Sequence, residues 1–215
     1  MCHNPHDLTS PFAAEFRAFA AEEARAPLPA NAILFYGSSS IRLWETLAQD
    51  FPGMPVVNRG FGGSTLGDCV TELDRLVVSA RPKAIVFYGG ENDLDQGARP
   101  EEVLQRFHRF AAGVRSRLGP IPLVVLSIKP SPSRMDNIER IRRTNALLRD
   151  AVPATPPSRL VDVFPHMLDA EGKSNHAYFC EDWLHLSPAG YRLWTSLVRE
   201  ALAHFGLLPR PEKRE

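Results

Sequence analysis

Residues 32–37 read AILFYG, a short and continuously apolar run that ends at a glycine. An unbroken apolar run of this length is typical of a strand that is buried on both faces, as strands in parallel sheets are. Similar runs follow further along the chain, at residues 55–58, 84–88, 123–128 and 159–163. The sequence therefore predicts five strands.

The segments between these runs carry apolar residues at helical spacing. They predict a helix ahead of the first strand and more helices after it, over residues 12–26, 41–50, 66–80, 100–118, 135–152 and 188–205. Strand and helix alternate along the chain, so we expect a parallel α/β sheet with helices on both faces.

Length and composition limit the function classes that need to be considered. A chain of 215 residues can bury a large core as one domain, and no linker or repeat divides it, so we expect a single domain over residues 1–215. Residues 1–10 and 209–215 are expected to be flexible termini. Because 25 Lys and Arg balance 25 Asp and Glu, no overall field attracts nucleic acid or a charged membrane. A small, weakly charged substrate fits this balance better.

The cysteines and the start of the chain indicate a compartment. Three cysteines, Cys2, Cys69 and Cys180, are odd in number and widely spaced, which suits reduced thiols better than a disulfide framework. The first residues lack a basic segment followed by an apolar run, and no stretch is long and apolar enough to span a bilayer. We expect a cytoplasmic protein without stable membrane insertion, and the sequence gives no oligomeric state.

Three serines follow the first predicted strand, because residues 37–40 read GSSS. In an open parallel sheet, ligands bind beyond the carboxyl ends of the strands, where loops lead into helices. Ser39 stands where the next helix begins, so its hydroxyl and its backbone N–H can face one cavity as nucleophile and oxyanion donor. Serines also cap helices commonly. The residues alone leave Ser38 and Ser40 open as nucleophiles.

A glycine cluster follows the second predicted strand, where residues 60–65 read GFGGST. Glycine lets backbone N–H groups approach a ligand closely, so a tight turn here is compatible with an oxyanion role. A dinucleotide site is the alternative. Against it, Thr65 stands where the third fingerprint glycine belongs, and the cluster follows the second strand rather than the first.

Residues 90–93, GEND, follow the third predicted strand. The carboxamide of Asn92 can donate a hydrogen bond to an oxyanion without adding a titratable proton, although Asn and Asp are also common in turns and caps. Glu91 and Asp93 stand two residues apart, a spacing that does not secure the facing carboxyl groups of an acid–base pair. We assign neither a catalytic role.

Asp182 and His185 stand close together near the end of the chain, in the stretch DWLH. The carboxylate can orient the imidazole and stabilise the imidazolium that forms when His185 takes the proton of Ser39. Asp and His also bind metals, and His166 and His176 are near in sequence. No HExxH or cysteine-rich ligand pattern accompanies them, so we expect neither a metal nor a cofactor.

These blocks resemble those of the SGNH (GDSL-type) hydrolase superfamily, which is named for Ser, Gly, Asn and His in four successive blocks. The resemblance extends over nearly the whole chain, from FYGSSS at residues 35–40 to DWLHL at residues 182–186. It implies a flavodoxin-like three-layer α/β/α sandwich with a five-stranded parallel sheet. The acidic residue that usually precedes the nucleophile is absent here, because Ser38 takes its place.

The resemblance also implies roles for particular residues. Ser39 would be the nucleophile, Gly63 and Asn92 the oxyanion donors beside the Ser39 N–H, and Asp182 with His185 the rest of a triad. The chain is similar at residues 37–42 to a bacterial branch with the sequence GSSSIR, whose members resemble the acetylhydrolase-type and carbohydrate-esterase members of the superfamily.

We therefore expect a serine esterase that hydrolyses small acyl esters, acetyl esters among them, through an acyl-enzyme. The small-molecule ester would be its partner, with no nucleic acid involved. Thioesterase or lysophospholipase activity of the same groups is one alternative. A non-catalytic module that binds carbohydrate or lipid on the same fold is another, although a pure binder has no need of a nucleophile, a base and an orienting acid together.

Overall fold

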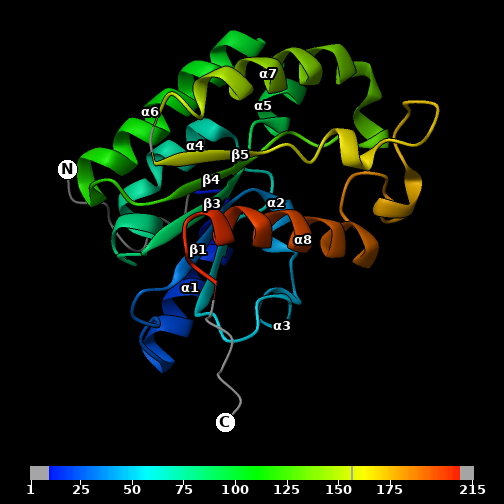
Figure 1. The fold of residues 1–215 in the computed structure, drawn as a ribbon. Helices are drawn as coiled ribbons and strands as arrows, with labels where there is room; N and C mark the ends of the chain where they lie inside the picture. The colour runs from blue at the N-terminus through cyan, green and yellow to red at the C-terminus, as the bar shows by residue number, and fades with distance from the viewer. Residues whose placement is uncertain (1–9, 156, 209–215) are drawn as a thin grey trace.

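The computed structural model describes residues 10–155 and 157–208. These residues form a five-stranded sheet in the order β2-β1-β3-β4-β5, with every neighbouring pair parallel (Figure 1). The strands are β1 (Ile33–Gly37), β2 (Val56–Gly60), β3 (Ala84–Tyr88), β4 (Leu123–Leu126) and β5 (Ser158–Val161). Each apolar run of the sequence forms one strand, and this strand order is that of flavodoxin-like folds.

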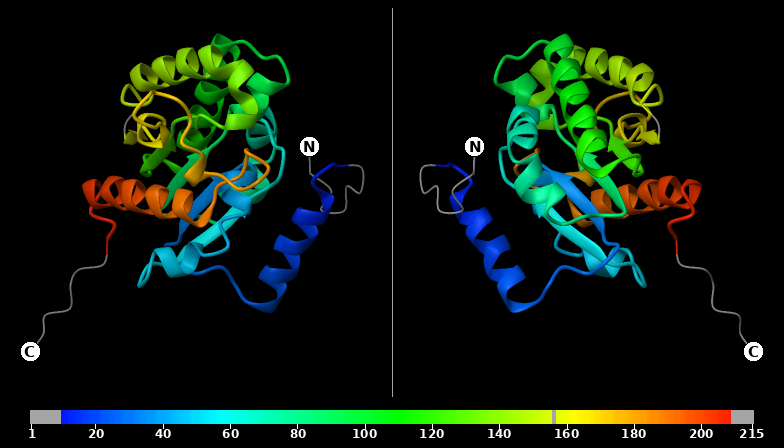
Figure 2. Two further views of the ribbon diagram at one scale, coloured as in Figure 1. Left: turned by 90° about the vertical axis from the view of Figure 1, so that its right-hand side faces the viewer. Right: turned by 90° about the vertical axis from the view of Figure 1, so that its left-hand side faces the viewer.

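Helices cover both faces of the sheet and complete three layers, as Figures 1 and 2 show. One face carries α1 (Ala13–Arg25), α4 (Leu66–Thr71), α6 (Pro100–Leu118) and α7 (Ile138–Ala151). The other carries α2 (Ser39–Arg42), α3 (Leu47–Asp50) and α8 (Pro188–His204). The expected three-layer α/β/α sandwich is confirmed.

Side chains of β1 pack alternately into two separate apolar cores. Leu34 and Tyr36 point into the apolar core under α6 and α7, whereas Ile33 and Phe35 point into the core under α8. All four side chains are fully buried. Burial on both faces is the reason why this strand is continuously apolar in the sequence.

Two of the predicted helices are broken, so the expectation of continuous helices over residues 41–50 and 66–80 is wrong. The first is split into α2 and α3 by the turn around Trp44, whose buried indole packs against Phe35 and donates to Asp50 Oδ2 at 2.6 Å. The second consists of α4 and a π-helical turn, η1 (Asp74–Val78). Apolar side chains still face the core in each piece, which is why the pattern looked continuous.

The remaining helices differ from expectation mainly at their starts. The helix predicted over residues 135–152 begins as a 3₁₀ turn, η2 (Pro132–Asn137), and continues as α7. A short helix, α5 (Glu91–Asp95), follows β3 and was not predicted. Two further 3₁₀ turns, η3 (Pro165–Met167) and η4 (His176–Tyr178), precede α8. Apart from Ser10, the expected flexible termini lie outside the described residues.

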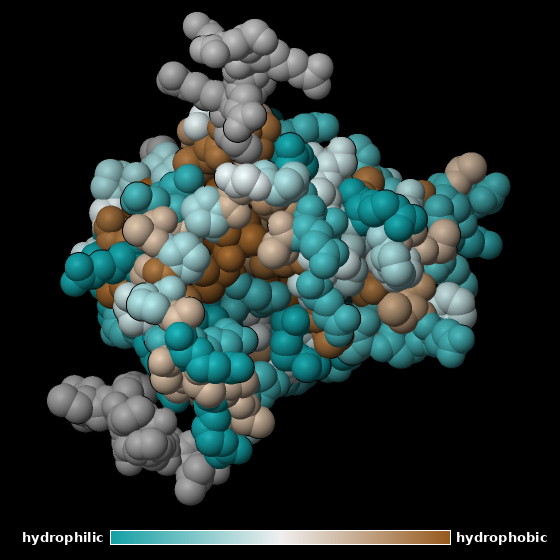
Figure 3. Space-filling model, turned by 90° about the horizontal axis from the view of Figure 1, so that it is seen from below, coloured by the Kyte–Doolittle hydropathy of each residue, from teal (hydrophilic) through white to brown (hydrophobic). Residues whose placement is uncertain are grey.

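The surface is mostly polar on the side drawn in Figure 3, with hydrophobic residues gathered near its middle. Among the described residues, the large hydrophobic side chains that are exposed are Met135 and Trp183. None of the helices within the described ranges combines the length and the apolar character that a membrane crossing requires.

Candidate active site

Ser39 lies at the carboxyl edge of the sheet, at the first position of α2. The chain turns there because Gly37, with φ +137°, lies against the backbone of Tyr88, where a Cβ would clash with the carbonyl oxygen. The N–H of Ser38 donates to that same carbonyl at 3.1 Å. As the first helical residue, Ser39 has no intrahelical acceptor for its own N–H.

The three consecutive serines differ in accessibility. Ser38 is 3% exposed and Ser40 is 1% exposed, whereas the side chain of Ser39 is only partly buried. Ser39 Oγ lies 3.1 Å from Nε2 of His185, a residue 146 positions further along the chain. Tyr191 of α8 donates to the carbonyl of Ser40 at 3.0 Å and ties α8 to α2. Of the triplet, Ser39 is the residue that meets the histidine.

The loop between η4 and α8 brings Asp182 and His185 together. Asp182 Oδ2 lies 2.5 Å from His185 Nδ1, and Oδ1 accepts the backbone N–H groups of Leu184 at 3.0 Å and His185 at 2.9 Å. The loop is closed by the N–H of Cys180, which donates to the carbonyl of His185 at 2.8 Å. Ser39, His185 and Asp182 therefore form one hydrogen-bonded row.

The surroundings of Asp182 keep its carboxyl group ionised. Burial alone would raise its pKa, but the backbone N–H groups of His185 and Leu184 and the His185 ring together lower it to about 2. A carboxylate in this position accepts from Nδ1–H of His185 and so leaves Nε2 free to accept a proton from Ser39. This is the tautomer that a general base requires.

Two further groups lie at the ends of the neighbouring strands. Gly63 follows β2, has φ +74°, and a Cβ built there would meet open space, so its backbone N–H can be approached. Asn92 lies in the first turn of α5 after β3, and its Nδ2 donates to the carbonyl of Ser64 at 2.9 Å. A carboxamide has two N–H groups. One holds Asn92 to the Gly63–Ser64 turn, and the second has no acceptor among residues 10–155 and 157–208, so it can donate to a ligand.

A buried charge network anchors the segment that carries Asn92. Lys129 is 1% exposed, forms an ion pair with Glu91 and donates to Ser131 at 2.8 Å, and Ser131 in turn donates to Glu91. Tyr88 also donates to Glu91, at 2.8 Å. Burial and the Glu91 carboxylate raise the pKa of Tyr88, so its hydroxyl keeps its proton and remains a donor.

Asp93 provides a second anchor on the other side of Asn92. It is fully buried, pairs with Arg106 of α6 at 2.6 Å and accepts the N–H of Leu66 at the start of α4 at 2.8 Å. Glu91 and Asp93 thus hold the backbone on both sides of Asn92. Sequence reasoning missed these contacts, although a lysine directly after the predicted strand of residues 123–128 was a signal that could have found the first of them.

The other candidate residues have structural contacts of their own. Within residues 10–155 and 157–208, no group of three or more His, Cys, Asp and Glu side chains is placed to hold a metal ion. His176 packs against the Trp183 ring at 4.5 Å. Gly60 is explained by packing, because a Cβ there would clash with the backbone of Arg42. Cys69 and Cys180 are free thiols, and Cys2 lies outside the described residues.

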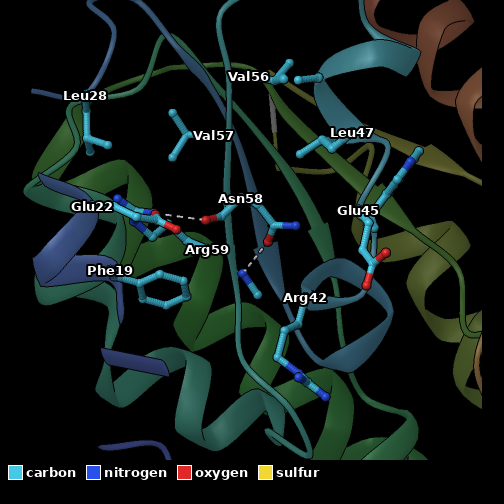
Figure 4. A pocket seen from close by; sticks show the side chains of 13 residues that line it. Phe19, Glu22, Leu28, Arg42, Glu45, Leu47, Val56, Val57, Asn58 and Arg59 are labelled. Atoms are coloured by element: carbon cyan, nitrogen blue, oxygen red, sulfur yellow. Dashed lines mark hydrogen bonds and ion pairs between the residues drawn. The ribbon is translucent and has the colours of Figure 1, made fainter. Parts of the chain in front are cut away.

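A hollow of about 460 Å³ lies beside β2, and none of Ser39, His185 and Asp182 lines it (Figure 4). Its central polar side chains are already paired. Arg59 donates to Glu22 at 3.2 Å and Glu23 at 2.8 Å, and Asn58 donates to the carbonyl of Ile41 at 2.7 Å. Because these polar side chains are paired and the lining includes no residue of the Asp182–His185 loop, we assign this hollow no chemistry.

The chain is similar to known proteins over most of its length. The model of the GDSL-like lipase/acylhydrolase family matches residues 32–193. The alpha1 subunit of platelet-activating factor acetylhydrolase IB from Bos taurus is 27% identical over 164 residues, which cover 74% of this chain and 69% of that protein. The matched segment of the family model includes every residue of the row and both neighbouring donors.

Solved structures show the same fold. A GDSL-like lipase from Bacteroides thetaiotaomicron superposes with a TM-score of 0.77 at 21% identity, covering 89% of this chain and 98% of that one. The lipase/acylhydrolase from Enterococcus faecalis gives a TM-score of 0.67 at 18% identity, with coverage of 86% and 100%. The architecture is therefore shared at low sequence identity.

Proposed function

The chain belongs to the GDSL-like lipase/acylhydrolase family, and we propose that it is a serine esterase that hydrolyses small acyl esters through an acyl-enzyme. The observation that carries this proposal is the hydrogen-bonded row of Ser39, His185 and Asp182. A nucleophile within hydrogen-bond reach of a base, which is itself oriented by a third group, is the signature of nucleophilic catalysis.

Acylation begins with Ser39. His185 Nε2 takes the hydroxyl proton while Ser39 Oγ attacks the ester carbonyl, and Asp182 stabilises the imidazolium that forms. The pKa of about 2 for Asp182 keeps this carboxylate charged throughout the working range of a hydrolase. Aspartate therefore orients and stabilises the histidine and does not itself take up the proton.

The negative charge that develops on the carbonyl oxygen needs donors already in place. The N–H of Ser39, the N–H of Gly63 and the free carboxamide N–H of Asn92 provide three. Their supports are rigid, because Asn92 is bonded to Ser64 and flanked by the buried pairs of Glu91 and Asp93. Fixed donors of this kind stabilise a transition state without reorganising during the reaction.

Collapse of the tetrahedral intermediate breaks the bond to the alcohol. The imidazolium of His185 returns its proton to the departing oxygen, which leaves the acyl group on Ser39. Water then attacks the acyl group while the same histidine takes its proton. Collapse of this second intermediate breaks the bond to Ser39 Oγ, which receives the proton from His185, and the acid is released. One base thus serves both half-reactions.

A short acyl group, with acetyl as the first candidate, is the substrate that we propose. No lid-like insertion separates Gly63 from Gly90, because that stretch is taken up by α4, η1 and β3. The relative from Bos taurus carries acetylhydrolase in its name, which supports the same size. A series of 4-nitrophenyl esters of increasing chain length should give its highest kcat/KM at two to four carbons, and an optimum at long chains would contradict this part.

The proposal is tested by Ser39→Ala with 4-nitrophenyl acetate as substrate. We expect kcat to fall by roughly 10⁴-fold or more, because removal of a triad member abolishes acyl-enzyme formation. Ser10→Ala, remote in sequence from all the site residues, is the control and should keep the parent rate. If Ser39→Ala hydrolysed the ester at the parent rate, the nucleophile would be elsewhere.

A further inference from the structure

A second hollow, of about 370 Å³, opens beside the loop that carries Asp182 and His185. It lies between η2, the segment ahead of η4 and the tip of the loop. The residues that matter in it are Ser133, Met135, Lys173, Ser174, His176 and Trp183. In Figure 1 the segments ahead of α8 form the yellow and orange loops beyond the end of β5.

The position of Trp183 links this hollow to the site. Trp183 stands between Asp182 and His185 in the loop, and its carbonyl accepts the N–H of Ser133 at 3.0 Å. The inference therefore rests on the proposed function, in which His185 protonates the departing alcohol. The loop that holds His185 therefore also forms one wall of the hollow.

The hollow holds both of the large hydrophobic side chains that the described residues leave exposed. Met135 is 38% exposed and Trp183 is 43% exposed. Trp183 also has φ +55°, in the left-handed region that non-glycine residues rarely adopt. Strain of this kind persists where the surroundings impose it, and it clusters at ligand sites. The His176 ring already packs against this indole, with ring centroids 4.5 Å apart, so the part of the indole that stays exposed is the flat apolar surface that a ligand ring can contact.

The floor of the hollow contains an unsatisfied hydroxyl. Ser174 is 6% exposed, and its Oγ has no hydrogen-bond partner among residues 10–155 and 157–208. Its backbone is fixed by a bridge to Leu168 and by the turn in which Asp169 N–H donates to the carbonyl of Lys173 at 2.8 Å. Buried hydroxyls nearly always have a partner. A ligand hydroxyl would supply one after a small rotation of Ser174.

We propose that this hollow is the leaving-group subsite and that it takes a ring-shaped polyol, such as one pyranose unit, stacked on Trp183. The apolar face of such a ring lies on the indole, and its hydroxyls are positioned to meet Ser174 and the ammonium of Lys173. A trimethylammonium head group fits less well because its positive charge meets Lys173 and no acidic side chain lines the hollow. An alkyl chain would leave Ser174 unpaired.

The test compares leaving groups at a constant acyl group. Acetate release is measured for a panel of mono-acetylated methyl pyranosides, for ethyl acetate and for acetylcholine. Trp183→Ala should lower kcat/KM on the best acetylated pyranoside by about tenfold or more, as truncation of an aromatic anchor does. On ethyl acetate it should change kcat/KM by less than about twofold, and Trp183→Phe should restore most of the loss on the sugar ester.

Ser174→Ala, which removes only the hydroxyl, should lower kcat/KM on the same sugar ester by a few-fold and leave ethyl acetate unaffected. An equal loss on both substrates in Trp183→Ala would mean that the residue only holds the catalytic loop and would overturn the subsite. If acetylcholine were a better substrate than the sugar esters, and if Trp183→Ala lowered kcat/KM more for acetylcholine than for them, the polyol assignment would be wrong.

A binding measurement separates the subsite from the chemistry. Of the three tryptophans, Trp44 and Trp194 are buried, so a ligand on the surface reports mainly through Trp183. Titration with non-acetylated methyl pyranosides should give a saturable fluorescence change that is absent in Trp183→Phe. No saturation with any member of the panel would contradict the subsite. Saturation without hydrolysis of any ester would instead contradict the proposed function alone.

Discussion

The two sides of the candidate site are built differently. The Asp182–His185 side is a surface loop in which the side chain of Asp182 is 49% exposed and that of His185 is 26% exposed, and its contacts are mostly short-range hydrogen bonds. The Asn92 side is held by ion pairs whose carboxylates, Glu91 and Asp93, are almost wholly buried. The aspartate and histidine of the row thus lie in an accessible loop, whereas the carboxylates that fix the position of Asn92 lie in the core.

Catalysis and stability are therefore expected to depend on different parts of the site. Removing an exposed side chain from the loop should alter the reaction and leave the fold intact. Removing one partner of a buried pair leaves an uncompensated charge in the core and should lower stability first. Single substitutions on each side of the site test whether the two effects are separate.

The largest effect is expected on the exposed side. His185→Ala should lower kcat by roughly 10⁴-fold or more, since the nucleophile loses its base, while the melting temperature stays within about 2 °C of the parent. Steady-state kinetics and thermal unfolding check the two parts. His204→Ala, an exposed histidine near the end of α8, is the control and should change neither. A markedly lower melting temperature of His185→Ala would show that the exposed loop also stabilises the fold.

The buried side should respond in the opposite manner. Lys129→Met leaves the Glu91 carboxylate buried without its cation and should lower the free energy of unfolding by about 3–5 kcal/mol. Urea unfolding measures this. The double variant Lys129→Met with Glu91→Gln should recover much of the loss because no lone charge is left. Lys173→Met, an exposed lysine, should stay within about 0.5 kcal/mol. If Lys129→Met unfolded with the same free energy as the parent, the Lys129–Glu91 pair would not be an anchor of the fold.

Asn92 is expected to affect both catalysis and stability. Asn92→Ala removes a proposed oxyanion donor and should lower kcat by about 10²–10³-fold with a smaller effect on KM. Because the carboxamide also bonds Ser64, a modest drop in the melting temperature is expected as well. Asn137→Ala, at the start of α7, is the matched control. Loss of binding with kcat unchanged would place Asn92 outside the oxyanion hole.

The smallest effect concerns acid stability. The pKa of Asp182 is lowered to about 2 in the folded chain, below the ordinary value of about 3.9 for an unfolded aspartate. A lowered carboxyl pKa stabilises the fold above the unfolded value, and that contribution is lost as the pH falls through the folded value. The difference in unfolding free energy between the parent and Asp182→Asn should therefore hold from pH 5 to 4 and shrink between pH 4 and 2. A difference that does not change below pH 4 would mean that Asp182 has no lowered pKa.

Much of the fold could be predicted from the sequence because burial on both faces leaves a direct trace. A strand such as β1 has no polar side, so its residues form an unbroken apolar run. The broken helix after Ser39 could not be predicted in the same way. Its two pieces both present apolar residues to one core, and the turn between them depends on the tertiary packing of Trp44 against Phe35.

The candidate site divides along the same line. Short sequence blocks predicted that these side chains would meet, and the structure places His185 within hydrogen-bond distance of Ser39 on one side and of Asp182 on the other. The pairing of Lys129 with Glu91 joins residues 38 positions apart through the interior. No local pattern encodes such a contact, since either residue alone would be expected at the surface.

Covalent labelling with a fluorophosphonate, followed by intact-mass measurement and peptide fragmentation, identifies the attacking serine directly. We expect one adduct per chain, located on Ser39 and absent from Ser38 and Ser40, with loss of ester hydrolysis in proportion to labelling. An adduct on another residue, or full hydrolysis with Ser39 unmodified, would contradict this expectation.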